Sequence, residues 1–113
     1  MEDKQNKEFD TSKICNQVRD LIHNENYITC YNLIVEEMKH CPHAPYPHNL
    51  LGMLLEQQGN HTLAMKHFRA SWALDPTYLP ARHNLEIYGT FYKNGVGAYD
   101  ESDCQILEEK TYM

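Results

Sequence analysis

Residues 50–76 read LLGMLLEQQGNHTLAMKHFRASWALDP, and this stretch decides the fold. Apolar residues recur at intervals of three and four on both sides of Gly59 and Asn60, which predicts two amphipathic helices. Gly59 permits a sharp turn, and the Asn60 side chain can cap the second helix by accepting from a free first-turn amide. Pro76 cannot continue a helix and ends the pair. The stretch therefore predicts two antiparallel helices joined by a short turn.

Helical spacing of apolar residues continues on both sides of this stretch. Asp10, Thr11 and Ser12 are candidate N-caps for the first helix of the chain, and Asn94 with Gly95 forms a candidate C-terminal stop for the last. No segment alternates polar and apolar residues over the length of a strand, so the chain is predicted to be all-α. The apolar positions that define five expected helices run over residues 14–22, 27–38, 50–55, 63–74 and 81–92, and the second helix is expected to end near His40.

A repeat links the central helix pair to the helices before it. Pro42 and Pro76 each follow a predicted helix and lie one period of about 34 residues apart. The second repeat resembles the tetratricopeptide repeat (TPR) family closely. The positions that carry the resemblance are a Leu-Gly pair, a large residue one turn later, a small and an aromatic residue in the second helix, and the closing proline: Leu51, Gly52, Leu55, Ala64, Phe68 and Pro76.

The resemblance implies a right-handed TPR-like array of antiparallel helix pairs with a C-terminal capping helix. The first repeat keeps the hydrophobic spacing and the closing proline but few signature residues, as terminal repeats often do. The expected organisation is a flexible tail over residues 1–10, a degenerate repeat over 11–44, a TPR repeat over 45–78, a capping helix over 79–94 and an acidic C-terminal tail over 95–113.

In function, the resemblance implies a small adaptor or scaffold that binds a peptide or helix of another protein. The binding surface of such proteins is a concave face lined by the first helix of each pair. Asn49 falls on this face, and its amide can pair with the backbone of a bound peptide. The residues expected to form the groove are Cys15, Arg19, Ile22, Asn49, Met53, Glu56, His83 and Ile87.

The tail leaves two alternatives open. Residues 95–113 contain an acidic stretch followed by Ile106 and Leu107, and this apolar pair could dock into a groove, either its own or that of a neighbour. The other interpretation is a solubilising tail without fixed structure. Two helix pairs and a cap make a short array, so self-association is a further way to complete burial.

Two alternatives belong to other classes of protein. One is a zinc-binding structural role, because imidazole and thiolate groups gather at His40, Cys41, His43 and His48. The other is a self-assembling structural module, which would be a homo-oligomer. The zinc interpretation lacks a second cysteine pair, and no nucleophile motif, phosphate loop or dinucleotide glycine motif occurs. An enzyme is therefore not expected, and no cofactor is expected.

Composition narrows the partners and the compartment. The 113 residues carry 10 Lys and Arg against 16 Asp and Glu, a net charge of −6. An acidic chain without a basic cluster does not suit nucleic acid or an anionic membrane. The N-terminus lacks the apolar region of a secretion signal, and no apolar run approaches the roughly 20 residues of a membrane span. We expect a cytoplasmic protein whose four cysteines are reduced thiols.

Overall fold

The chain folds into an array of helices. A computed structural model describes the backbone of residues 2–90 and 96–104, and the side chains of residues 11–90 and 96–104. The helices are α1 (Glu2–His23), α2 (Tyr27–His40), α3 (Tyr46–Gln57), α4 (His61–Leu74) and α5 (Leu79–Gly89), and residues 101–104 add a single helical turn. These described ranges contain no strand, so the predicted all-α class is confirmed. None of their helices has the length and apolar character needed to cross a membrane.

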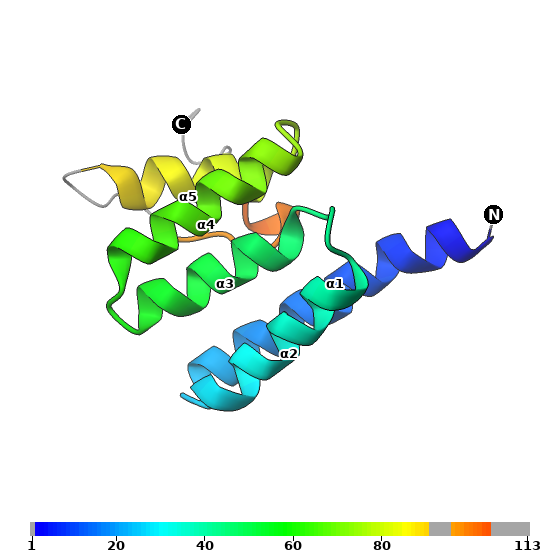
Figure 1. The fold of residues 1–113 in the computed structure, drawn as a ribbon, viewed down its shortest axis with the longest axis horizontal. Helices are drawn as coiled ribbons and strands as arrows, with labels where there is room; N and C mark the ends of the chain where they lie inside the picture. Colours follow the sequence, from blue (N-terminus) through cyan, green and yellow to red (C-terminus); the bar gives the residue numbers. More distant parts are fainter. Residues whose placement is uncertain (1, 91–95, 105–113) are drawn as a thin grey trace.

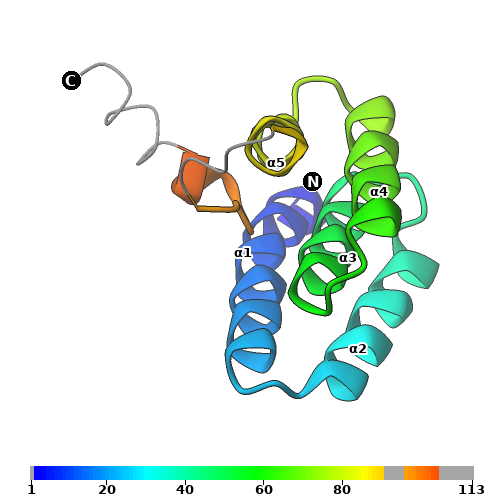
Figure 2. The same cartoon turned by 90° about the vertical axis from the view of Figure 1, so that its left-hand side faces the viewer.

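The helices run antiparallel in sequence order, each packed against the next (Figure 1). Helix α3 also contacts α1 and α5, which places these three helices on one side of the molecule, while α2 and α4 lie on the other (Figure 2). Residues 96–104, drawn in orange, return to the side formed by α1, α3 and α5. We call this surface the α1–α3–α5 face, and residues 96–104 the C-terminal segment.

The first helix begins earlier than the sequence analysis expects. Residues 2–10 belong to α1 in the structure, whereas the sequence pattern predicts a flexible tail over residues 1–10 and a helix start near Ser12. The early residues lack an apolar stripe, which is the feature that periodicity detects. They also lack Gly and Pro and contain Lys, Glu and Gln, which all favour helix. Helix propensity therefore extends α1 beyond its amphipathic part.

Local sequence explains the other helix boundaries. Pro47 and Pro80 both lie in the first turn of their helices, where the missing amide hydrogen costs no hydrogen bond. Gly59 adopts a φ of +83°, which a residue with a side chain rarely does. The Asn60 side chain accepts a hydrogen bond from the Leu63 amide at 3.4 Å, as expected of the cap of α4. Helix α5 ends at Gly89, where Thr90 adopts extended dihedral angles, so it stops before Tyr92, the last apolar position of the expected helix. Glycine is a poor helix former, which favours an end there. The stop predicted at residues 94–95 lies outside the described residues.

Helices α3 and α4 approach each other closely at Gly52. A Cβ atom built on Gly52 would lie less than 3.0 Å from three ring carbons of Phe68, so only glycine permits this contact. The Phe68 side chain is fully buried, and its ring also stacks on that of Tyr88 with 5.8 Å between centroids. One aromatic side chain thus joins α3, α4 and α5.

We predict that Gly52→Ala destabilises the protein, although alanine favours helix by about 1 kcal/mol. Overpacking against the ring outweighs that gain, and the net loss should be about 1–2 kcal/mol. Urea unfolding measures it. The same substitution in a Phe68→Leu background should cost less, because the smaller side chain leaves room for the methyl group. An equal cost in both backgrounds would show that the ring is not the cause.

Candidate functional site

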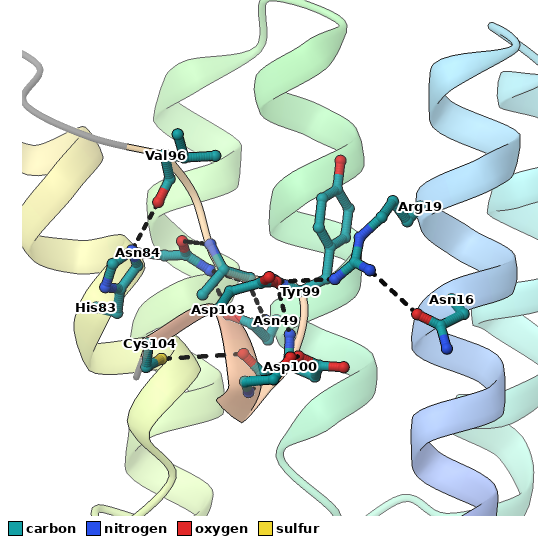
Figure 3. Close-up of polar contacts among 12 residues, drawn as sticks. Asn16, Arg19, Asn49, His83, Asn84, Val96, Tyr99, Asp100, Asp103 and Cys104 are labelled. Atoms are coloured by element: carbon teal, nitrogen blue, oxygen red, sulfur yellow. Dashed lines mark hydrogen bonds and ion pairs between the residues drawn. The ribbon is translucent and has the colours of Figure 1, made fainter. Parts of the chain in front are cut away.

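The C-terminal segment is buried against the α1–α3–α5 face. Ala98 is 0% exposed, Tyr99 7% and Cys104 3%, whereas the Val96 side chain is 77% exposed. Residues 96–98 have no regular secondary structure, a bend follows, and the turn of helix at 101–104 ends the described part. Figure 3 shows the polar contacts that hold this segment.

Two buried asparagines bind the backbone of the segment at Ala98. Asn49 of α3 and Asn84 of α5 are each 0% exposed, and the Asn84 amide donates to the Asn49 side-chain oxygen at 2.8 Å. Both amides donate to the carbonyl oxygen of Ala98, at 3.0 and 2.8 Å. The Ala98 amide donates in return to the Asn84 side-chain oxygen at 2.7 Å. We call these two residues the amide pair; they satisfy both backbone groups of one buried residue.

A histidine adds a further backbone contact two residues earlier. Nε2 of His83 lies 2.7 Å from the carbonyl oxygen of Val96 (Figure 3). A carbonyl only accepts, so Nε2 carries the hydrogen in this contact. Together with the amide pair, His83 recognises the backbone of residues 96–98 without using their side chains.

Arg19 of α1 holds the other end of the segment. Its guanidinium group donates to the Asp103 carboxylate at 2.8 Å and lies 5.0 Å from the centroid of the Tyr99 ring. The same carboxylate oxygen accepts from the Tyr99 amide at 2.9 Å, which fixes the turn between these residues. Burial raises the pKa of Tyr99 to about 12, so the phenol stays neutral beside the cation at physiological pH.

Two small residues let the segment pack closely against the helices. A Cβ atom on Gly97 would lie 2.8 Å from the terminal methyl of Met53 and would also meet the Tyr88 hydroxyl. The next residue, Ala98, is completely enclosed. Beside Gly97 and Tyr99 remains a cavity of about 370 Å³, bordered by Ile22 and Met53.

Of the eight residues expected in the groove, five lie beside the C-terminal segment. Arg19, Asn49 and His83 bond to the C-terminal segment, and Ile22 and Met53 border the cavity beside it. Cys15 and Ile87 are buried. Glu56 instead turns to α4, where its carboxylate meets His61 Nδ1 at 2.5 Å.

Three residues that make contacts at this site were not among the expected groove residues: Asn84, Tyr99 and Asp103. Asn84 lies 35 residues after Asn49, close to the repeat period, and this spacing is the signal that could have found it. Tyr99 and Asp103 lie in the stretch interpreted as a tail. Residues 106 and 107, the apolar pair considered for docking, lie outside the described residues.

The Cys15 thiol lies in an environment that disfavours the reactive thiolate form. Burial, helped by the nearby Asp100 carboxylate, raises the pKa of Cys15 to about 12. The thiolate is the nucleophilic form of cysteine, so this side chain stays protonated and packs as a small hydrophobic group.

The four residues of the zinc alternative have different partners. His40 Nδ1 lies 2.8 Å from the Glu36 carbonyl oxygen, and the Cys41 sulfur accepts from the Tyr46 hydroxyl at 3.4 Å. His48 pairs with His67, while His43 is exposed. No group of three metal-ligating side chains converges in the described part of the chain, so the zinc interpretation lacks support there.

His48 and His67 form a stacked pair between α3 and α4. Their Nδ1 atoms are 3.0 Å apart, and the ring centroids 5.3 Å. One Nδ1 donates and the other accepts, so the contact requires at least one neutral ring. Burial lowers the pKa of both rings from the ordinary value of 6.5, and at His67 the neighbouring ring lowers it further.

No family model, curated protein or solved structure matches this chain.

The amide pair gives a prediction about stability. Asn84→Ala leaves the Ala98 amide and the Asn49 oxygen without their partner in a buried place, and we expect a loss of about 2–3 kcal/mol in urea unfolding. The matched control is Asn32→Ala, because Asn32 is an exposed asparagine of α2. That substitution should change the free energy of unfolding by no more than about 0.5 kcal/mol relative to the wild type. A cost at position 84 no larger than at position 32 would contradict the structural role of the pair.

The histidine pair gives a prediction about pH. Because the folded-state pKa values are lowered, the unfolded chain takes up protons first as the pH falls below 7, and stability is lost. Above pH 7 both states are neutral and the pair contributes no pH dependence. Thermal unfolding at pH 7.5 and 5.5 should show a smaller loss of Tm for His48→Gln/His67→Gln than for the wild type. The exposed control His43→Gln should behave as the wild type does.

Proposed function

We propose that this chain is a small TPR-like adaptor, without enzymatic activity, that binds an extended peptide of another cytoplasmic protein on the α1–α3–α5 face. The observation that carries the proposal is the pairing of the amide pair with the backbone of Ala98. Contacts to backbone groups do not depend on side-chain identity, so a groove that makes them can hold a peptide from another chain. The C-terminal segment is the example of such a ligand that the molecule itself provides.

Three features support the TPR-like part of the proposal. The contact of Gly52 with Phe68 joins the two helices at positions that match the family pattern. The alternate helices α1, α3 and α5 share one side, as the first helices of successive pairs do in a repeat array. Pro42 and Pro76 keep the repeat period.

Affinity capture from lysate tests the adaptor function. We expect one protein to be recovered by the wild type and by Asn32→Ala. Its recovered amount should fall at least about tenfold with Asn49→Ala/Asn84→Ala, with circular dichroism showing that this variant is folded. The reason is that the double variant removes the donors that hold a peptide backbone.

Peptide arrays of the recovered protein should then locate one short binding segment. Equal recovery by all three baits would contradict binding on this face. Recovery of nothing but a second copy, with a dimeric mass by light scattering, would favour the self-assembling module instead.

A further inference from the structure

The C-terminal segment defines the chemistry of the ligand that its own groove selects. The first requirement is small size at two successive positions. The residue at position 97 faces the Met53 methyl and the Tyr88 hydroxyl, and a Cβ atom there would require the ends of these side chains to move. The residue at position 98 is fully enclosed, with space for the methyl group of Ala98. A bulky residue at either place is excluded by packing.

The second requirement is a free backbone at position 98. Both members of the amide pair are fully buried, and a ligand that failed to bond with them would leave polar groups without partners. Proline lacks the amide hydrogen that donates to Asn84, so it is excluded at this position. The peptide must therefore present both a backbone N–H and a C=O group at this position, as Ala98 does.

The third requirement is an aromatic ring followed by a carboxylate, both placed around Arg19. The guanidinium group contacts the Tyr99 ring and pairs with Asp103, which lies four residues later. The carboxylate also accepts from the amide of the aromatic residue, so the spacing of four is set by the turn itself. The cavity beside Tyr99 leaves space for a ring of different size. Cation–π contact and charge pairing thus act on one arginine.

We propose that the α1–α3–α5 face selects acidic peptides with two small residues, then an aromatic residue, then an aspartate four residues after it, and that the C-terminal segment occupies the site as a competing internal ligand. This inference rests on the proposed function and names the partner chemistry for that same site. An internal ligand lowers the apparent affinity for an external one by the fraction of time that it occupies the groove. To displace the segment, a partner must make the same contacts and also either be present at high local concentration or make additional contacts.

A pair of peptides and three full-length proteins test this. The probe is a fluorescent peptide with the sequence of residues 96–104 and serine in place of the cysteine, and the control peptide has the same composition in scrambled order. Gly97→Val should evict the internal segment, because its side chain meets Met53 and Tyr88 while the face itself is unchanged. Glu101→Gln is the matched control, since it changes an exposed residue of the same segment.

We expect the probe to bind Gly97→Val at least about tenfold more tightly than it binds the wild type or Glu101→Gln in fluorescence anisotropy. Adding Asn84→Ala to Gly97→Val should abolish that gain. A second evicting variant, Asp103→Ala, should reproduce it, because it removes the charge pair with Arg19 without adding bulk. Circular dichroism confirms that each variant is folded, and hydrogen exchange at the Ala98 position confirms eviction.

Each other outcome overturns the proposal in a distinct way. Equal binding of the scrambled peptide would end the selectivity while leaving general peptide binding in place. No binding of either peptide to an evicted, folded variant would overturn the motif, and the capture experiment on the amide pair would then decide separately whether the face binds proteins at all. A stable dimer of the wild type, with the segment exchanged between copies, would make a second copy the occupant instead.

Discussion

The close approach of α3 and α4 at Gly52 is the constraint on which the rest of the structure depends. With no Cβ at this position, Phe68 packs directly against the backbone of α3, and α3 becomes a central helix in contact with α1, α2, α4 and α5. A helix enclosed by neighbours buries polar residues as well as leucines. Asn49 lies one turn before Gly52 and is fully buried on the α1–α3–α5 face. The packing that forms the core therefore also positions the site.

Much of the fold follows from the sequence because apolar periodicity and turn residues act locally. The helices α2 and α4 lie where the apolar spacing predicts them, and Gly59 and Asn60 form the turn and the cap that their chemistry favours. The early start of α1 could not be read from periodicity, since residues 2–10 carry no apolar stripe. Propensity alone extends that helix, and propensity is a weaker signal than pattern.

The site was partly predictable for the same reason. The register of the proposed repeat directs Arg19, Asn49 and His83 to one face, and the structure finds all three bonded to the C-terminal segment. The occupant itself was not predictable. The helices bind mainly the backbone of Ala98, and a pattern of side chains in the sequence gives no information on backbone contacts. The acidic residues of the segment resemble those of a solvated tail. Which backbone groups are buried and hydrogen-bonded can be seen only in the folded structure, where their partners are in place.

The C-terminal segment also changes how the helices depend on one another. Most of the packing in this chain is between neighbours in sequence, and α1 and α5 do not pack directly against each other in the described residues. The segment links them, because Asp103 pairs with Arg19 of α1 while Ala98 bonds to Asn84 of α5 (Figures 2 and 3). A linear array of helices frays from its ends, since each end has one neighbour. The segment therefore adds a second connection between α1 and α5, beside the one through α3. We expect that loss of α1 weakens the packing of α5 and that the helices unfold together.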